Sequence, residues 1–125
     1  MTYLDTHALI WLNPGEAAGL SGRARRAIDA DDELLLSPMV LLELENLHEI
    51  RRFRFSAADW MANIGAHFGI RICSYPFGLV MDQALREKWT RDPFDRIIVA
   101  HARARKAPLI TSDQEILRHY ELAVW

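Results

Sequence analysis

Acidic side chains stand at positions from which several carboxylates could act together on one substrate. Asp92 and Asp95 open one predicted helix. Asp5 and Asp113 each directly follow a predicted strand, and Glu43 lies within a second predicted helix. Clustered carboxylates bind hard cations such as Mg²⁺ or Mn²⁺, and a bound cation can activate water for phosphodiester hydrolysis. A metal-dependent nuclease is therefore the hypothesis that these acids suggest.

Glu43 is the most informative of these acids because of its place on a helix predicted over residues 39–50. At about 100° per residue, it falls inside the apolar arc of that helix. The arc is formed by Met39, Val40, Leu44, Leu47 and Ile50. A buried carboxylate needs a cation or hydrogen-bond donors. Glu43 is thus interpreted as a metal ligand or base, with a buried ion pair to an arginine as the structural alternative.

The two acids that open the helix after Pro93 receive different interpretations. Asp95 lies on the apolar side of this helix, among residues 98–102. The helix dipole explains why an acid is tolerated in the first turn, but it does not explain this apolar position. Asp92 precedes a proline at the first helical position, which is typical of an N-cap. We interpret Asp92 as a helix cap first and as a site residue second.

Asp5 and Asp113 gain weight from the predicted sheet. Strands are predicted over residues 2–4, 34–36, 70–73, 108–111 and 122–124, with helices between them. This alternation is typical of an α/β fold with a parallel sheet and helices on both faces. Ligands bind such sheets beyond the carboxyl ends of the strands. Both acids are therefore predicted at the ligand-binding edge, although each could also cap the helix that follows it.

Length and composition limit the class of protein. The chain has 125 residues, half of them apolar, which predicts one globular domain over residues 1–125. No apolar run is long enough to cross a membrane, and no signal peptide is visible. The single cysteine, Cys73, fits a reducing, cytoplasmic setting and is expected in the core.

The charge distribution matters more than the total charge. A net charge of −2 argues against nucleic-acid binding through overall charge alone. Arginines nevertheless form local clusters. The candidates for contact with an RNA backbone or a protein partner are Arg23, Arg26, Arg51 and Arg52. A solvated helix face explains these clusters equally well.

The histidines do not have the spacing of a zinc site. His48, His67 and His119 lack metal-ligand spacing, so oxygen-only ligation favours Mg²⁺ or Mn²⁺. His7, beside Asp5, could contact a substrate. His101 lies on an apolar helix face and is predicted to be a core or interface residue.

The order of these motifs resembles that of the PIN-domain ribonucleases, most closely the VapC-type toxins of type II toxin–antitoxin systems. Four segments carry the resemblance: Tyr3–His7, Ser37–Glu43, Asp92–Arg96 and Thr111–Asp113. The resemblance implies a PIN-like three-layer α/β/α fold with a short, mostly parallel central sheet. It also implies a catalytic, metal-binding tetrad of Asp5, Glu43, Asp95 and Asp113. The supporting candidates are Asp92, Thr111, Ser112 and His7.

The function implied by this resemblance is Mg²⁺-dependent endoribonuclease activity, with Mn²⁺ as an alternative ion. It also implies an RNA substrate, a VapB-like cognate antitoxin, a homodimer and a cytoplasmic location. Two positions depart from the family pattern: Val40 stands where relatives often carry Ser, and Leu42 where they often carry Trp.

Three other functions were compared with the sequence. A haloacid dehalogenase-type phosphatase would have a second Asp two residues after Asp5, where this chain has His7. A receiver domain would have an Asp at the end of a later central strand, and residues 70–74 provide none. A catalytically silent module that only binds an antitoxin or RNA is the remaining alternative. An inward-facing Glu43 argues against it.

Overall fold

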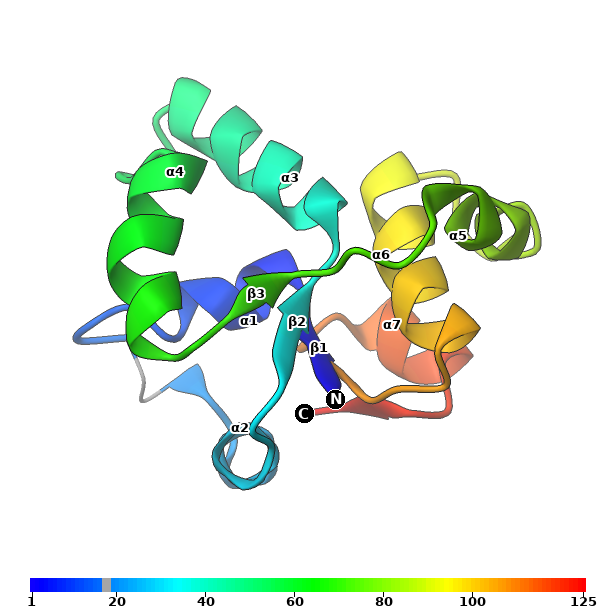
Figure 1. Cartoon of the computed structure of the whole chain (residues 1–125), viewed down its shortest axis with the longest axis horizontal. Coiled ribbons are helices and arrows are strands. Elements are labelled where there is room, and N and C mark those ends of the chain that lie inside the picture. The colour runs from blue at the N-terminus through cyan, green and yellow to red at the C-terminus, as the bar shows by residue number, and fades with distance from the viewer. Residues whose placement is uncertain (17–18) are drawn as a thin grey trace.

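A computed structural model describes residues 1–16 and 19–125 of the chain and contains a parallel sheet surrounded by helices (Figure 1). The strands are β1 (Thr2–Leu4), β2 (Leu34–Leu36), β3 (Arg71–Ile72), β4 (Leu109–Ile110) and β5 (Ala123–Val124). Their order is β3-β2-β1-β4-β5, and every neighbouring pair is parallel. The predicted α/β class and the short parallel sheet are confirmed.

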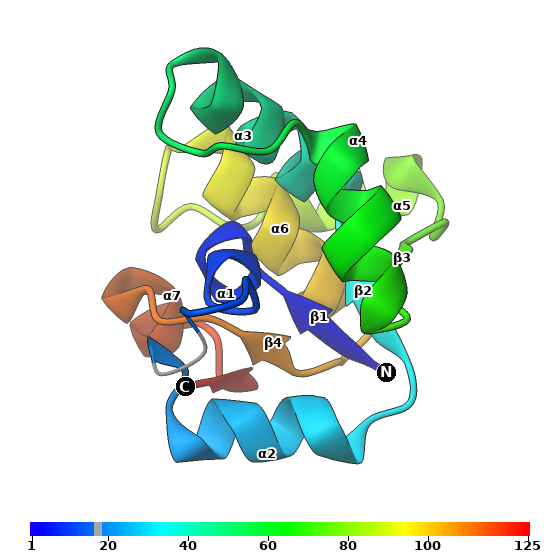
Figure 2. The ribbon, with the colours of Figure 1, turned by 90° about the vertical axis from the view of Figure 1, so that its left-hand side faces the viewer.

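Helices connect successive strands on both faces of the sheet. They are α1 (Thr6–Ile10), α2 (Gly22–Ala30), α3 (Pro38–Glu49), α4 (Ala57–Trp60) followed by the π-helical turn η2 (Met61–Gly65), α5 (Phe77–Ala84), α6 (Pro93–Ala104) and α7 (Gln114–His119). Figures 1 and 2 both show α2 below the strands, and α3 and α6 above them. This arrangement is the α/β/α architecture expected of a PIN-like fold.

Local capping explains where most helices begin. The hydroxyl of Ser21 accepts a hydrogen bond from the backbone N of Ala24 (3.0 Å), and Ser37 accepts one from Met39 (3.2 Å). Pro38 takes the first position of α3, where no backbone donor is needed. Each cap satisfies an N–H that the first helical turn leaves without a partner.

The expected boundaries of one helix were wrong. The helix expected from Leu79 to about Lys88 is α5, Phe77–Ala84, so it begins and ends earlier. The guanidinium of Arg96 donates to the carbonyl of Ala84 through Nε (3.2 Å) and Nη2 (3.0 Å). This contact satisfies a terminal carbonyl of α5, and the chain then turns toward the buried Glu87. Arg96 thus has a structural role within the segment Asp92–Arg96.

The core confirms two further expectations from the sequence. Cys73 is a buried free cysteine, and His101 is buried with its Nδ1 at 3.2 Å from the carbonyl of Ile97. The large side chains of Trp60 and Tyr3 fill the space between sheet and helices. In the described part of the chain, no helix combines the length and apolar character needed to cross a bilayer.

Candidate functional site

The strand order creates a switch point between β1 and β4. From β1 the chain adds β2 and β3 on one side of the sheet, and β4 and β5 on the other. Ligands bind parallel sheets at such a point, beyond the carboxyl ends of the strands. Asp5 directly follows β1, and Thr111 directly follows β4. The backbone N of Asp5 donates to the carbonyl of Ile110 (3.1 Å), which joins the two strand ends.

Asp5 is held rigidly at this edge. Its side chain is almost completely buried, at 4% exposure. Oδ1 accepts a hydrogen bond from the backbone N of Ala8 (2.8 Å) and thereby caps α1. Oδ2 accepts a short hydrogen bond from the hydroxyl of Thr111. A carboxylate oxygen can accept more than one bond, so both oxygens keep capacity for a ligand.

Thr111 connects Asp5 to Asp113. Its buried hydroxyl donates to Asp5 and accepts from the backbone N of Asp113 (3.0 Å). Asp113 in turn caps α7, because its Oδ1 accepts from the backbone N of Glu115 (2.8 Å) and of Ile116 (3.2 Å). Ser112 is half-buried and forms no side-chain hydrogen bond within residues 1–16 and 19–125.

Asp92 caps α6, as its place before Pro93 predicts. Its Oδ1 accepts from the backbone N of Phe94 (2.8 Å) and of Asp95 (3.1 Å), and its side chain is exposed. Pro93 occupies the first helical position. The cap fixes the first turn of α6 and therefore the direction in which the Asp95 side chain projects from the helix.

The carboxyl of Asp95 is influenced by the charges of the other predicted acids. Burial, together with the negative charges of four acids, raises the pKa of Asp95 to about 7. In order of effect, these neighbours are Asp92, Asp113, Glu43 and Asp5. They belong to β1–α1, α3, α6 and α7, so one half-buried carboxyl senses charges from four parts of the chain. We call Asp5, Glu43, Asp95 and Asp113 the acid cluster.

The electrostatics of Asp5 follow the same pattern. Burial raises the pKa of the Asp5 carboxyl, and the charge of Glu43 adds to the rise. Hydrogen bonds from Thr111 and Ala8 and the charge of the exposed His7 oppose it, and the net pKa is about 6. Glu43 itself is half-buried on α3. Both Asp5 and Asp95 are thus carboxyls whose ionisation costs free energy in this environment.

The acid cluster is not a finished coordination shell. Among the residues that the structure places, no three His, Cys, Asp or Glu side chains approach closely enough to form a metal-binding group. The charges of the four acids influence one another, but their oxygens do not lie close enough together to coordinate a single ion. Their oxygen donors are still the type that Mg²⁺ and Mn²⁺ prefer.

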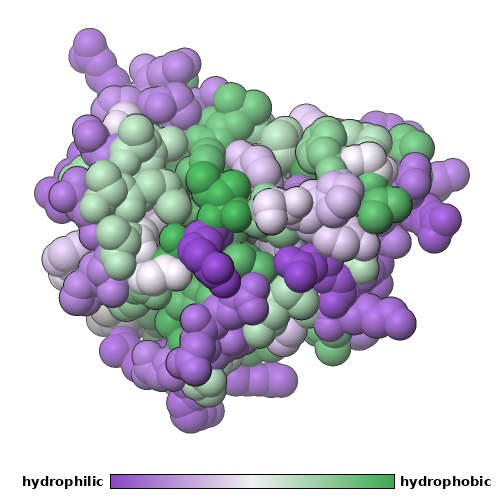
Figure 3. Space-filling model, in the orientation of Figure 1, coloured by the Kyte–Doolittle hydropathy of each residue, from purple (hydrophilic) through white to green (hydrophobic). Residues whose placement is uncertain are grey.

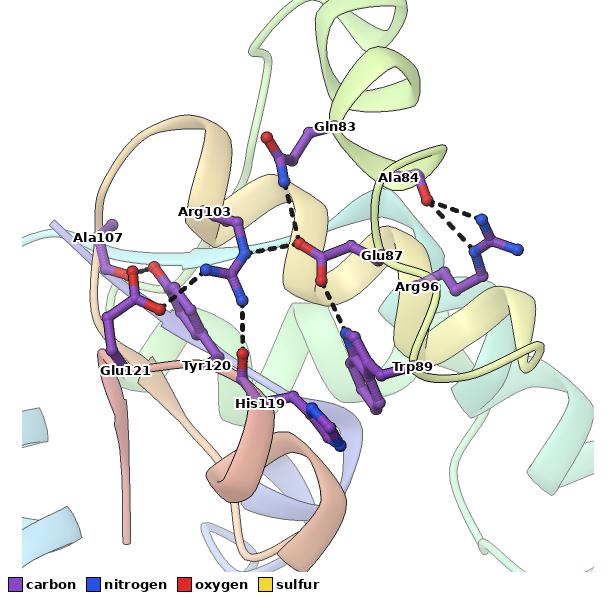
Figure 4. A network of polar contacts seen from close by, with 10 residues as sticks. All are labelled: Gln83, Ala84, Glu87, Trp89, Arg96, Arg103, Ala107, His119, Tyr120 and Glu121. Carbon is purple, nitrogen blue, oxygen red and sulfur yellow. Dashed lines mark hydrogen bonds and ion pairs between the residues drawn. The ribbon is translucent and has the colours of Figure 1, made fainter.

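A second polar network supports the site and was not expected from the sequence (Figure 4). The buried carboxylate of Glu87 accepts from Nε of Arg103 (2.6 Å), Nε2 of Gln83 (3.1 Å) and Nε1 of Trp89 (2.7 Å). The network ties the chain entering α6 to the last turn of that helix. Charged neighbours on both sides of Glu87 hide its burial in the sequence.

The same arginine also holds α7. Arg103 donates to Glu121 (2.8 Å) and to the carbonyl of His119 (2.7 Å), and its guanidinium lies over the ring of Tyr120. His119 is the last residue of α7, whose N-cap is Asp113. Arg103 therefore positions the helices that carry Asp95 and Asp113. A buried acid and a distant arginine give no local sequence pattern that would have revealed this contact.

The four candidate arginines divide into two places. Arg23 and Arg26 are exposed on α2, below the strands in Figures 1 and 2. Arg51 and Arg52 are exposed in the loop that follows α3. Only the second pair extends from the side of the sheet where the acid cluster lies.

Two comparisons with known proteins agree with this geometry. The PIN domain family matches residues 2–122, nearly the whole chain. Ribonuclease VapC22 of Mycobacterium tuberculosis (strain ATCC 25618 / H37Rv) is 29% identical over 119 residues, which cover 93% of this chain and 89% of that protein. The resemblance drawn from the acidic motifs is confirmed, and the chain belongs to the PIN domain family.

Proposed function

We propose that this protein is a metal-dependent endoribonuclease and the toxin of a type II toxin–antitoxin pair. The observation that carries the proposal is the field at Asp95, where burial and four acids together raise the pKa. In the described part of the chain, no arginine, lysine or histidine forms an ion pair with the acid cluster. The similarity to a protein named as a VapC ribonuclease supports the same activity.

The chemistry of the acid cluster suits Mg²⁺, with Mn²⁺ as an alternative. Burial and the neighbouring acids disfavour the charged forms of Asp5 and Asp95, and a divalent cation removes this cost. When bound, Mg²⁺ supplies positive charge that activates water and neutralises the reacting phosphate. We propose Asp5, Glu43, Asp95 and Asp113 as the residues that would hold it. A shell that closes when cation and RNA bind is consistent with acids that share a field but not yet ligating distances.

The chain's own residues orient this site. Thr111 and the backbone of Ala8 fix both oxygens of Asp5. Asp92 fixes the first turn of α6 and thus aims Asp95. In the metal-free protein, Asp95 has a pKa near neutrality, so it can exchange a proton at the carboxyl oxygen under physiological conditions. Asp92, Thr111 and His7 are supporting residues in this proposal.

The proposal includes three partners, which are RNA, a VapB-like antitoxin and a second copy of the chain. A negatively charged cluster at the sheet edge would attract a basic antitoxin segment. Because cellular RNA is the substrate, we place the activity in the cytoplasm. A catalytically silent PIN module that binds antitoxin or RNA is the alternative, and it leaves the cost of gathering four acids unexplained.

A homodimer is proposed from one apolar face. Large apolar side chains are about half exposed on α3, β3 and α5: Leu42 50%, Ile72 44%, Phe77 51% and Leu79 49%. Figure 3 shows hydrophobic surface over α3 and α5 on this face. Exposed apolar patches of this kind mark interaction sites. Light scattering of the purified chain tests the dimer, and a monomeric mass at micromolar concentration contradicts it.

The decisive experiment on the activity combines variants with metal removal. Purified protein should cleave RNA with Mg²⁺, and Asp95→Asn should lower the rate by at least about 100-fold while the fold is kept. Asp32→Asn is the matched control, because Asp32 is an exposed acid outside the cluster. Cleavage that survives both chelation and Asp95→Asn contradicts the proposal. If neither the wild type nor any variant cleaves RNA, but all of them bind it, the catalytically silent module is favoured.

A further inference from the structure

The loop that follows α3 presents three exposed arginines next to two aromatic rings. Residues 51–55 read Arg-Arg-Phe-Arg-Phe, and Arg51, Arg52 and Arg54 are all exposed. None of the three forms an ion pair within residues 1–16 and 19–125. In Figure 3, hydrophilic side chains gather at the end of α3 that lies farthest from the sheet. Unpaired cations on a protruding loop are available for an anionic partner.

The backbone at Arg51 is unfavourable for an arginine. The backbone N–H of Arg51 donates to the carbonyl of His48 (3.0 Å), and that of Arg52 donates to the carbonyl of Leu47 (2.8 Å). Together these bonds form a Schellman motif at the end of α3. Arg51 has φ of 61°, the left-handed conformation that normally selects glycine at this position. The backbone conformation therefore does not itself favour an arginine here, and glycine would fit it with less strain.

The loop is anchored to α3 through Phe53, which keeps its arginines at the end of that helix. Phe53 is buried, and its carbonyl lies 3.0 Å from Nδ1 of His48. The rings of Phe53 and Phe55 meet edge to face at 5.9 Å. The guanidinium of Arg54 lies over the ring of Phe55, with Cζ 4.5 Å from its centroid. A guanidinium stacked on a ring presents a flat cationic surface on which a nucleobase can stack.

The position of this loop connects it to the acid cluster. Glu43 lies on α3, and Arg51 follows it by about two helical turns, or about 12 Å along the axis. We propose that Arg51, Arg52 and the Arg54–Phe55 pair bind an unpaired RNA segment a few nucleotides from the scissile phosphate. Arg51 and Arg52 contact phosphates, and a base stacks on Arg54. The choice of RNA as ligand rests on the proposed ribonuclease function.

RNA is favoured over a protein partner for two reasons. The proposed antitoxin carries a basic segment toward the acids, and that charge is repelled by this loop. Cations interleaved with aromatic rings match the combined backbone and base contacts of proteins that bind single-stranded RNA. Arg23 and Arg26, on α2 below the strands, lack such rings beside them in the sequence and are not part of this surface.

Lys106 provides a matched control within the same chain. It is also an exposed cation in the left-handed conformation, with φ of 52°. The backbone N–H of Lys106 donates to the carbonyl of Arg103 (3.1 Å), and that of Ala107 donates to the carbonyl of Ala102 (3.0 Å). Helix α6 therefore ends in the same motif. Because Lys106 precedes β4, it lies at the amino edge of the sheet, away from Asp5. Arg51→Gly and Lys106→Gly therefore remove the same charge and relieve the same strain at opposite edges.

The test measures binding of a fluorescently labelled oligouridylate to Asp95→Asn protein, so that cleavage does not interfere. Arg51→Gly should weaken binding about 5-fold at 0.1 M salt and reduce the slope of log affinity against log salt by about 0.7. Replacing Arg51, Arg52 and Arg54 together should reduce that slope by about 1.4, because two of the three contact phosphates, and should weaken binding further through the lost base stacking. Lys106→Gly should change neither quantity, and neither glycine variant should lower the melting temperature.

Three outcomes overturn the proposal. They are an unchanged salt slope in Arg51→Gly, an equal loss in Lys106→Gly, and loss of antitoxin binding without any loss of RNA binding. The proposed function fails separately from this inference. If wild-type protein cleaves no RNA but binds oligouridylate through Arg51, the RNA surface stands and the nuclease assignment does not.

Discussion

Helix α6 carries carboxylate chemistry at both ends, and the protein neutralises only one of them. Near its last residue, Arg103 pairs with the buried Glu87 and the exposed Glu121. At its first turn, Asp95 faces three acids from other elements and no pairing cation in the described part of the chain. The N-terminal end of α6 carries its own acids, Asp92 and Asp95, whereas its C-terminal end carries basic side chains and meets acids from other parts of the chain.

The difference shows how a structural acid can be separated from a site acid. Burial alone would lower the pKa of the Arg103 guanidinium, but its contacts with Glu87 and Glu121 raise it overall. Arg103 and Glu121 are therefore stabilised in their charged forms. At Asp95 and Asp5 the charged form is disfavoured. A bound cation would stabilise both carboxylates there. The neutralised network makes this possible by holding α6 and α7 in place.

The largest expected effect comes from breaking the neutralised end. Glu87→Gln should lower the free energy of unfolding by about 2 kcal/mol, because Arg103 loses its buried counter-charge while it keeps Glu121. Chemical denaturation of the metal-free protein measures this change. The matched control is Glu121→Gln, which removes an exposed partner of Arg103 and should cost less than about 1 kcal/mol of unfolding free energy. Equal losses in the two variants would contradict the distinction between buried and exposed partners.

A smaller loss is expected from Thr111→Val at the acid cluster. The hydroxyl of Thr111 donates to Asp5 and accepts from the backbone N of Asp113, so both groups lose a buried partner. The free energy of unfolding should fall by about 1–2 kcal/mol, and cleavage should fall as well because Asp5 loses its orientation. Thr111→Ser keeps both bonds and should restore most of the activity. A fully active Thr111→Val protein would mean that the hydroxyl does not position Asp5.

The two ends also differ in how far the sequence predicts them. Asp5, Asp113 and the cap at Asp92 could be placed because each follows a local pattern, such as a strand end or an Asp-Pro pair. The parallel sheet follows from the same alternation of strands and helices. Their approach to Asp95 depends on the sheet order, which no local pattern predicts, and the sequence indicated it only through the tetrad that the resemblance to PIN domains implies.

The Arg103 network could not be predicted in this way. Glu87 lies between Arg86 and Lys88, and a charged run of this kind is typical of solvated surface. Its partner Arg103 is a full helix away, and their contact depends on how α5 packs on α6. The predicted boundary at Lys88 was wrong because α5 ends at Ala84, whose carbonyl accepts from Arg96, before the chain reaches Glu87. Partner choice between distant charges is a tertiary property, and one sequence carries little information about it.

The pH dependence of stability should reveal the acids at the N-terminal end of α6, which have no pairing cation in the described part of the chain. Asp95 and Asp5 have folded-state pKa values of about 7 and about 6, above the ordinary value of 3.8, so the folded protein binds protons more tightly. Their stabilising contribution is fully present below about pH 4 and is lost as pH rises through 6 and 7. Metal-free protein should therefore lose melting temperature over this window, and Mg²⁺ should remove the loss. A melting temperature that rises steadily from pH 5 to pH 8 without metal would contradict the shifts.

The smallest effect is a gain, and it gives the sharpest contrast between the two ends. Asp95→Asn removes one charge from the acid cluster, so metal-free protein at pH 8 should become more stable by less than about 1 kcal/mol, because the site is partly screened by solvent. At pH 5 wild-type Asp95 is already protonated in the folded state, so the gain should disappear. Glu87→Gln should destabilise at both pH values. If Asp95→Asn destabilises the protein at pH 8, Asp95 has a neutralising partner and the two ends of α6 are alike.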